Sequence, residues 1–253
     1  MYGVERRQWI LDRARADGRV DVGEVSHRLG VASETVRRDL SALDRHGLVH
    51  RVHGGAVPID RLGYESQLTL RAARRQSEKQ RIAAAALAHL PGLESVYLDE
   101  GSSVQLLAEM LHPERPLTVV TSSVVLAAVL APRPQITVLV LGGRVRGLTL
   151  ATVEQWAVEM LGDLVLDAAV LGTNGLSAEH GCTCPDAAVA AVKSAALRAS
   201  RSSILLADHT KFGADSFCAF ARWRDIDTVI TDRGAAPDQI QSLRALGCEV
   251  EVV

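Results

Sequence analysis

The chain has 253 residues, a formal net charge of −2 and 47% hydrophobic residues. These values predict globular folding and leave room for a small domain beside a full-sized one. A net charge so close to zero excludes binding to nucleic acid through overall positive charge, so any DNA contact must come from locally placed basic residues.

The first predicted helix spans residues 4–16, and four of its residues can pack inside a small domain: Val4, Ile10, Leu11 and Ala14. Arginine supplies the positive charge in this part of the chain. Residues 1–61 contain no Lys and eleven Arg, against nine Asp and Glu. Because this excess of two charges is small, the positions of Arg37, Arg38 and Arg51 matter more than the number of arginines.

A second helix is predicted between Asp21 and Gly30. Asp21 precedes Glu24 by three residues, the spacing of a capping box, and glycine commonly follows a helix C-terminus. In the third helix an apolar stripe lies apart from the polar and basic residues: Val36, Leu40 and Leu43 against Arg37, Arg38, Ser41 and Arg45. Two short helices around a glycine turn predict a helix-turn-helix, whose second helix presents its N-terminal residues to the major groove.

Residues 47–57 predict two short strands that meet near Gly54 and Gly55, a candidate wing beside the helices. The block Thr35-Val-Arg-Arg-Asp-Leu40, followed by Arg51-Val-His-Gly-Gly-Ala56, resembles the winged helix of DeoR-type bacterial transcriptional repressors. One departure is Ala32, where the family usually has the capping Ser; here Ser33 would cap one residue later. The predicted DNA contacts are Ser33, Glu34, Thr35, Arg37, Arg38, Arg51 and His53.

After the wing, residues 58–76 have no clean apolar period and include Gly63, which predicts an interdomain connector. The expected organisation is therefore a DNA-binding domain over residues 1–57, the connector over 58–76, and a second domain over 77–253. Residues 78–90 are strongly helical in pattern and are stopped by Pro91-Gly92.

From Ser95 onward, short apolar runs alternate with helical segments. The predicted strands are 96–98, 117–121, 136–141, 168–171, 203–207, 226–231 and 249–253. Helices are expected through Leu107 and Met110, from Ser123, near 186–200 and near 236–246. Strands that are apolar throughout are buried on both faces, so we expect an open, mostly parallel α/β domain whose sheet is covered by helices.

Polar residues concentrate directly after five of these strands, where open α/β sheets bind their ligands. These loops are Asp99-Glu-Gly-Ser-Ser103, Thr121-Ser-Ser123, Gly142-Gly-Arg144, Gly172-Thr-Asn-Gly175 and Asp208-His-Thr-Lys-Phe-Gly213. Glycine lets backbone amides approach an anion, and Ser or Thr hydroxyls at a helix start complete a phosphate cradle. A single loop of this kind is explained by turn and cap preferences. Five in succession favour a binding site.

In this order the motifs resemble those of the DeoR C-terminal sensor domain, which is related to sugar-phosphate isomerases and CoA transferases. The resemblance implies that a phosphorylated sugar binds there and lowers the affinity of the protein for operator DNA. The implied phosphate ligands are Gly101, Ser102, Ser103, Thr121 and Ser123, and the implied sugar ligands are Asp99, Asn174, Lys193, Asp208 and Lys211. Ser122, Gly142 and Gly143 complete the expected ligand-binding set.

The leading hypothesis is therefore a repressor of a sugar or carbohydrate catabolic operon, acting on operator DNA as a homo-oligomer, either a dimer or a tetramer. An isomerase-like enzyme with an appended DNA-binding domain is the alternative. Many relatives have Asp and Glu where this chain has Asn174 and Val189, and neither of these side chains can act as the base of an isomerase. Asp99, Glu100 and Asp208 remain available, so catalysis is disfavoured without being excluded, and we expect no enzyme activity.

A third hypothesis makes the N-terminal helices a protein-docking module, which would lack salt-dependent DNA affinity.

The sequence has neither a signal peptide nor an apolar run of about 18 or more residues, so we expect a cytoplasmic protein with no membrane partner. Cys182-Thr-Cys184 has the pattern of half a metal or redox site, but no second Cys/His pair with ligand spacing lies nearby, so we interpret both cysteines as small loop and core residues. We expect neither a metal nor a cofactor.

Overall fold

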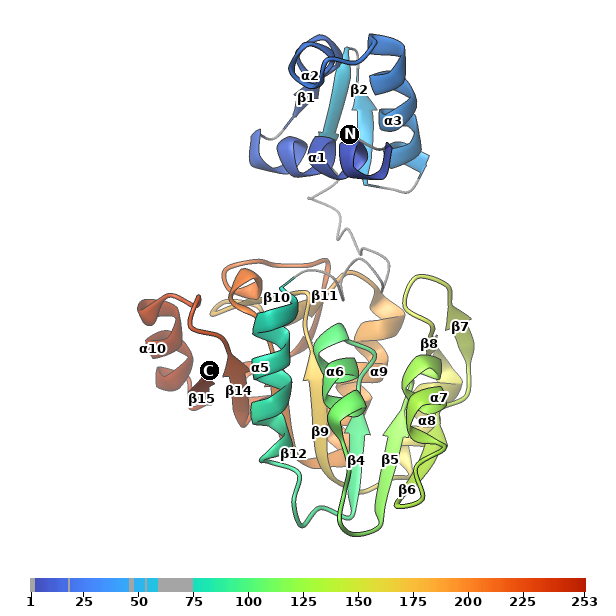
Figure 1. The fold of residues 1–253 in the computed structure, drawn as a ribbon. Coiled ribbons are helices and arrows are strands. Elements are labelled where there is room, and N and C mark those ends of the chain that lie inside the picture. The colour runs from blue at the N-terminus through green and yellow to red at the C-terminus, as the bar shows by residue number, and fades with distance from the viewer. Residues whose placement is uncertain (1–2, 18, 46–47, 53, 59–74) are drawn as a thin grey trace. The chain divides into compact units, whose positions relative to one another are not determined.

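The computed structural model describes residues 3–17, 19–45, 48–52, 54–58 and 75–253. The chain forms two compact units, Met1–Ser66 and Gln67–Val253, and each is described by itself (Figure 1). His53 and most of the predicted connector over 58–76 lie outside the described residues.

The first unit is a helix-turn-helix with a wing. Its helices are α1 (Gly3–Asp17), α2 (Val22–Leu29) and α3 (Ser33–Arg45). Its strands, β1 (Val20–Asp21), β2 (Val49–Val52) and β3 (Gly55–Pro58), form an antiparallel sheet in the order β1-β3-β2. The helices and strands enclose one core that includes Ile10, Leu11, Val36, Leu40 and Leu43. The predicted stripe of α3 is therefore the buried side of that helix.

Helix α2 begins and ends as predicted. Asp21 Oδ1 accepts hydrogen bonds from the amides of Gly23 at 2.8 Å and Glu24 at 3.2 Å. Gly30 follows the helix with φ of 62°, a left-handed conformation that glycine adopts without steric cost. Local capping thus determines both ends of the helix.

Helix α3 begins differently from the prediction. The amides of Thr35 and Val36 donate to the carbonyl of Ala32 at 2.9 and 3.3 Å, so Ala32 is the last residue before the helix. Ser33 is already helical, and its hydroxyl lies 3.3 Å from the Ser26 hydroxyl of α2. Ser33 therefore joins the two helices instead of capping α3, because its side chain points toward α2.

Asp39 connects α1 to α3. Its Oδ2 is 2.5 Å from Arg6 Nε, its Oδ1 is 3.5 Å from Arg7 Nη1, and its side chain is 5% exposed. We expect Asp39→Ala to lower the free energy of unfolding of the first unit by about 2 kcal/mol, because it removes a charged acceptor and leaves the mostly buried guanidinium of Arg6 without this partner. Urea unfolding measures the loss. Asp17→Ala, which removes an exposed partner of Arg13, should change stability by less than about 0.5 kcal/mol; equal losses would contradict this account.

The second unit is built on a seven-stranded parallel sheet. Its order is β15 (Glu249–Val252), β14 (Thr228–Thr231), β12 (Ser200–Leu206), β9 (Leu166–Gly172), β4 (Ser95–Leu98), β5 (Leu117–Thr121) and β6 (Ile136–Val140). These strands are the seven predicted apolar runs. The expected open α/β domain is confirmed, and all pairs of neighbouring strands in this sheet are parallel.

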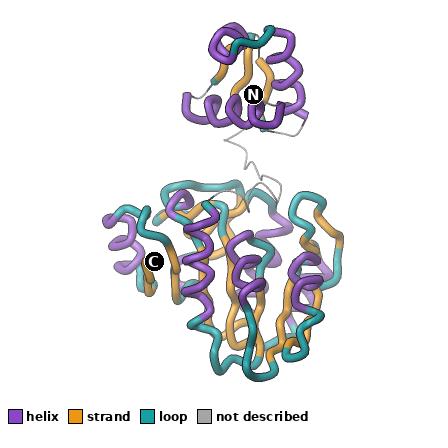
Figure 2. Tube along the Cα trace, viewed as in Figure 1, coloured by secondary structure: helices purple, strands orange, loops and turns teal. Residues whose placement is uncertain are grey.

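Helices cover both faces of this sheet (Figure 2). Helices α5 (Gln76–Leu87), α6 (Ser102–Met110) and α7 (Val124–Leu130) pack on the face that includes Val96 and Leu98. Helices α8 (Gln155–Gly162), α9 (Ala187–Ala199) and α10 (Pro237–Ala245) pack on the opposite face, which includes Tyr97. Alternate residues of one strand therefore contribute to different cores.

Several short elements were not predicted. They are α8, the hairpin of β7 (Arg144–Arg146) and β8 (Ala151–Val153), the antiparallel sheet of β10 (Gly175–Ser177), β11 (Gly181–Cys184) and β13 (Cys218–Ala221), and the 3₁₀ turns η1 (His209–Lys211) and η2 (Trp223–Asp225). The strands and 3₁₀ turns among them have only three or four residues, too few for an apolar period to show, and the eight residues of α8 make little more than two helical turns. In the described part of the chain, no helix has the length and apolar character needed to span a bilayer.

Candidate functional site

The outer side of α3 exposes two arginines. The Arg37 and Arg38 side chains are 54% and 82% exposed, whereas Val36 and Leu40 on the inner side are completely buried. Glu34 lies 3.5 Å from Arg37 Nη1 and 3.9 Å from Arg38 Nε. Exposed ion pairs of this kind contribute little, so both guanidinium groups can exchange Glu34 for another anion.

The wing adds a third arginine beside α3. Arg51 of β2 donates from Nη1 to the hydroxyl of Ser41 at 3.0 Å, and Ser41 in turn donates to the carbonyl of Arg37 at 2.8 Å. The structure thus brings Arg37 and Arg51 to the same side of the unit. Together with Arg38 they form a basic surface on the helix that the sequence predicts to read DNA.

In the second unit, all five predicted loops follow neighbouring strands. The strands β12, β9, β4, β5 and β6 lie side by side and are parallel, so the loops after them meet at one edge of the sheet (Figure 1). This edge contains residues that are far apart in the chain, and it is the position at which open α/β sheets bind ligands.

A buried ion pair occupies this edge. Lys193 of α9 donates from Nζ to Asp99 Oδ2 and to the carbonyl of Gly172 at 3.0 Å, and lies 3.7 Å from Glu100 Oε2. The Lys193 side chain is 4% exposed and the Asp99 side chain is 0% exposed. The amide of Gly172 also donates to Asp99 Oδ2 at 2.9 Å. We call Asp99, Glu100 and Lys193 the charged cluster.

The charged cluster contains two carboxyls and one ammonium. Burial favours a neutral Lys193, but the negative charges of Asp99 and Glu100 outweigh it and raise the pKa of Lys193, which stays charged. Burial, followed by the neighbouring charge of Glu100, raises the pKa of Asp99 from 3.8 to about 8. One ammonium thus cannot compensate both carboxylates. Among the described residues, Asp99 Oδ1 is a buried oxygen that lacks a hydrogen-bond partner.

The N-terminus of α6 lies beside the charged cluster. Gly101 is the N-cap of α6, and Ser102 and Ser103 form its buried first turn. A Cβ on Gly101 would lie 3.5 Å from the Cα of Gly172, so these two loops approach closely. Unpaired amides at a helix N-terminus favour anions, so this turn suits a phosphate next to the charged cluster.

The loop after β5 uses its hydroxyls within the fold. Thr121 donates to the carbonyl of Leu98 at 2.6 Å and accepts from the amide of Ser123 at 3.0 Å. Ser123 caps α7, and the Ser122 hydroxyl lies 3.0 Å from the Tyr97 hydroxyl. Thr121 has no hydroxyl proton left for a phosphate. Any phosphate contact from this loop must therefore use another group.

Gly142 and Gly143 have a different environment. They follow β6, the last strand of the sheet, and the amide of Gly142 donates to Met160 Sδ at 3.0 Å. Gly143 has φ of 129°, and a Cβ there would lie 2.3 Å from the carbonyl oxygen of Val153. Close approach of the backbone to β8 therefore explains why residue 143 is a glycine, without reference to a ligand.

The remaining predicted residues follow β9 and β12. Asp208 is 3% exposed and caps η1 by accepting from the amide of Thr210 at 3.0 Å, and the amide of Lys211 donates to the Asp208 carbonyl at 3.0 Å. Asn174 is half-buried, and its backbone amide donates to the carbonyl of Thr183 at 3.1 Å. Asp208 therefore stabilises the turn that contains Lys211.

Lys79 was not predicted as a site residue. It lies in the first turn of α5 and is 5% exposed, on the same side as Ile82, Ala83 and Ala86. This side of α5 packs on β12 and β14. The spacing of Lys79 to these apolar residues is the signal that could have revealed it, since i, i+3, i+4 and i+7 share one helix face.

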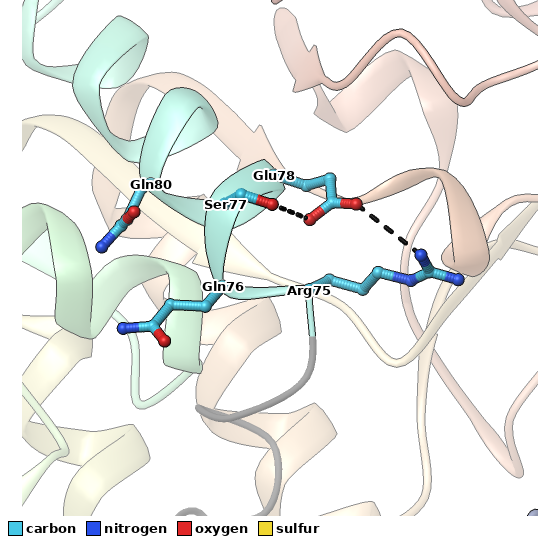
Figure 3. Close-up of a pocket in the computed structure, with 5 residues that line it drawn as sticks. All are labelled: Arg75, Gln76, Ser77, Glu78 and Gln80. Carbon is cyan, nitrogen blue, oxygen red and sulfur yellow. Dashed lines mark hydrogen bonds and ion pairs between the residues drawn. The ribbon is translucent and has the colours of Figure 1, made fainter.

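A shallow pocket surrounds the same turn of α5. Figure 3 shows Ser77 and Arg75 on either side of Glu78, with Gln76 and Gln80 pointing away. Ser77 Oγ donates to Glu78 Oε2 at 2.7 Å, and Arg75 Nη1 lies 3.7 Å from Glu78 Oε1. The pocket is open, and most of its side chains are exposed. It lacks the enclosure and buried polar atoms that the charged cluster has.

Asp186 holds the start of α9, which carries Lys193. Its Oδ1 accepts from the amides of Ala188 and Val189 at 2.9 and 3.1 Å, and its Oδ2 accepts from Arg146 Nε at 3.0 Å. Burial acts to raise the pKa of Asp186, but these hydrogen bonds outweigh it and hold the pKa below 3.8. The ionised form is thus favoured in the folded domain.

A lowered carboxyl pKa stabilises the fold above the unfolded pKa and loses this effect as pH falls through the folded value. We expect the second unit to lose stability below about pH 4, and Asp186→Asn to make this loss shallower. Asparagine also caps helices, so the variant removes the charge and keeps the cap. Urea unfolding between pH 6 and pH 3 tests this; identical pH profiles for the two proteins would contradict it.

The cysteines lie within the second unit. Cys182 and Cys184 belong to β11 and are buried, and burial raises the pKa of Cys184 to about 12, which keeps it a thiol. Within the described ranges, no three His, Cys, Asp or Glu side chains are grouped so that they could hold a metal ion. These two cysteines pack in the apolar core of the sheet face covered by α8 and α9.

A winged helix in one unit and a buried charged cluster at the edge of an open α/β sheet in the other define a two-domain transcriptional regulator. Residues 6–61 match the family model described as DeoR-like helix-turn-helix domain, and residues 74–233 match the model described as DeoR C terminal sensor domain. The chain belongs to the DeoR family. The resemblance seen in the sequence is confirmed.

Relatives match almost the whole chain. The transcriptional regulator GlpR of Haloferax volcanii is 32% identical over 99% of this chain and 98% of its own length. The transcriptional repressor GlcR of Bacillus subtilis is 32% identical over 92% of this chain and 90% of its own length. Because such relatives are named as regulators and not as enzymes, the chain is a DNA-binding transcriptional regulator, and the isomerase alternative is not favoured.

Solved structures resemble parts of this chain more distantly. Ribose 5-phosphate isomerase A from Methanocaldococcus jannaschii has a TM-score of 0.37 and 12% identity, with 54% of each chain covered. The eIF2B beta subunit from Chaetomium thermophilum has a TM-score of 0.45 and 13% identity, with 61% of this chain and 48% of that chain covered.

Proposed function

We propose that this regulator represses a sugar or carbohydrate catabolic operon and leaves its operator when a phosphorylated sugar binds the second unit. The observation that carries the proposal is the charged cluster beside the N-terminus of α6. Asp99 Oδ1 is buried without a hydrogen-bond partner in the described chain. A sugar hydroxyl, which can both donate and accept, would satisfy this oxygen in the ionised or the protonated form of Asp99, because a buried polar atom without a hydrogen-bond partner is costly.

The phosphate would bind next to the sugar. The turn of Gly101, Ser102 and Ser103 starts α6 and lies against Gly172, so its amides and hydroxyls face the same edge of the sheet as the charged cluster. On the sugar side, Lys193 would keep Asp99 in place while Asn174, Asp208 and Lys211 contact further hydroxyls. The names of two relatives support repression: GlcR is a repressor, and a 26% identical protein of Escherichia coli O157:H7 is a putative aga operon repressor.

DNA would be bound through the basic surface of the first unit. Arg37, Arg38 and Arg51 are exposed there, and the N-terminal residues of α3 would enter the major groove. We infer that the protein acts as a homo-oligomer, a dimer or tetramer, because a symmetric dimer presents two α3 helices to half-sites about 34–36 Å apart. It would act in the cytoplasm, where its operator lies.

Induction would follow from a difference in ligand affinity. The oligomer would have two arrangements, one whose spacing of α3 helices fits the operator and one whose spacing does not. A sugar phosphate that binds the second arrangement more tightly weakens DNA binding by the difference between its binding free energies for the two arrangements. Residues 58–76 would form the connector between residues 1–57 and 77–253, and would allow the change in spacing.

The test is binding of the purified protein to DNA from upstream of its own operon, at fixed salt, with a panel of sugar phosphates. We expect one compound to release the DNA, and Asp99→Asn to bind the same DNA without being released. Binding that no compound releases, with no compound raising the melting temperature, would contradict a sugar-phosphate effector. Absence of DNA binding under every condition would contradict the regulator, and turnover of the same panel would then be measured.

A further inference from the structure

Large apolar side chains gather at one end of the seven-stranded sheet. Of thirteen exposed large hydrophobic residues in the described chain, eight belong to α7, β6, the β7–β8 hairpin with its turn, and α8. Trp156 is 71% exposed and the other seven are 41–49% exposed. We call these eight the β6-end surface: Val124, Leu139, Val140, Val145, Leu148, Leu150, Trp156 and Met160.

Two contacts join these elements into one surface. The amide of Gly142 donates to Met160 Sδ at 3.0 Å, which places α8 beside the end of β6. The amide of Val124 donates to the carbonyl of Leu150 at 3.0 Å, which joins the start of α7 to the hairpin. Figure 1 shows α7, α8, β6, β7 and β8 together at the end of the sheet away from β15. Scattered single hydrophobic residues need no explanation, but such a cluster indicates an interaction site.

Strand β6 also has an open side. The Leu141 amide donates to the Thr121 carbonyl and the Gln135 carbonyl accepts from the Leu117 amide, so alternate residues starting at Gln135 turn their backbone toward β5. The backbone groups of Val138 and Val140 therefore face away from β5.

The two ends of the sheet differ in how they avoid unwanted pairing. Proteins commonly protect an edge strand with charged residues. At the opposite end, β15 contains Glu249 and Glu251, whereas β6 from Ile136 to Val140 contains no charged residue. An unprotected and apolar edge favours a partner strand.

We propose that the β6-end surface binds the same surface of a second copy of this chain, with the two β6 strands antiparallel across a twofold axis. A twofold interface must complement itself, and an identical β6 supplies the matching unpaired strand. The charged pair beside the surface, Arg144 Nε and Glu154 Oε1 at 2.6 Å, has one charge of each sign. It therefore offers nothing to nucleic acid and suits an identical surface.

The size of the surface agrees with this partner. The eight side chains together present on the order of 700 Å² of apolar surface, close to the roughly 800 Å² per partner of a standard stable interface. The inference deepens the proposed function and rests on it for one point only, that the dimer holds two α3 helices for two half-sites.

The test compares two leucine-to-glutamate variants in the full chain. Leu139 on β6 and Leu246 after α10 are 43% and 45% exposed, at opposite ends of the sheet. We expect sedimentation to give an oligomer for the wild type and for Leu246→Glu, and a dissociation constant at least about tenfold higher for Leu139→Glu. In a tetramer, Leu139→Glu should remove one of the two association steps.

Trp156→Glu provides a second variant on α8, in case a charge on β6 perturbs folding; circular dichroism checks both. Unchanged association of Leu139→Glu and Trp156→Glu would overturn the proposal, as would a monomeric wild type at micromolar concentrations. Equal loss of association in Leu246→Glu would also overturn it. Because mass is measured without DNA or sugar phosphate, this result is independent of whether the proposed operator or effector is found.

Discussion

Lys193→Met is expected to lower the free energy of unfolding of the second unit by about 3–5 kcal/mol, the usual result of removing one partner from a buried ion pair. The substitution keeps most of the side-chain volume and removes the ammonium. Asp99 and Glu100 would then be buried carboxyls with no cation within the charged cluster. Urea unfolding followed by tryptophan fluorescence measures the change, because Trp223 is 7% exposed within the second unit.

Two further proteins make this result specific. Arg198→Met removes an exposed cation from the same helix and should change stability by less than about 0.5 kcal/mol. Combining Lys193→Met with Asp99→Asn should recover part of the loss, because the amide no longer needs a cation. If Lys193→Met and Arg198→Met are equally stable, Lys193 is not the buried partner of Asp99.

The double variant Arg37→Ala and Arg38→Ala is expected to weaken operator binding about 100-fold or more at fixed salt. Each good arginine contact with a base edge or phosphate contributes about 1–3 kcal/mol, and a tenfold change corresponds to about 1.4 kcal/mol. Both side chains are exposed, and Glu34 is their common partner. Stability should therefore change little, since the interactions lost within the protein are exposed ion pairs.

Salt dependence distinguishes contacts with phosphates from contacts with bases. Each lost phosphate contact should reduce the slope of log K against log salt by about 0.9, whereas a lost base contact leaves the slope unchanged. Arg224→Ala is the matched control, since its side chain is 85% exposed against 82% for Arg38 and it belongs to the second unit. Equal affinities of the wild type and the double variant would exclude α3 as the reading helix.

The helices and strands were predictable where local pattern dominates. Asp21 begins α2 because its side chain accepts hydrogen bonds from the first turn, and Gly30 ends it because glycine adopts a left-handed conformation. Both effects are local, so they can be predicted without knowledge of the rest of the fold. Most strands of the parallel sheet stand out as apolar runs because helices cover both of its faces, whereas the edge strand β15 contains Glu249 and Glu251. In contrast, β7 and β8 are three residues each, and their pairing depends on the hairpin and on neighbouring contacts.

The candidate site depends on contacts between distant residues. Asp99 and Lys193 are 94 residues apart and meet because α9 packs beside β9 and β4 brings its end next to β9. The sequence pattern placed both in one ligand set through resemblance, but it did not predict that they form a buried pair. Lys79 was missed although its spacing to Ile82, Ala83 and Ala86 places it on the apolar face of α5, which packs on β12 and β14.

Thr121 is a predicted phosphate ligand whose hydroxyl is used within the fold. Its hydroxyl follows a strand as predicted, but the neighbouring strand β4 supplies the Leu98 carbonyl that accepts its proton. Sequence periodicity and capping chemistry thus sufficed for the helix-turn-helix, the wing and the parallel sheet, since these follow from short-range backbone preferences and burial. The direction of each polar side chain in the site was set by packing between elements far apart in the chain, where hydrogen-bond partners and local dielectric are determined.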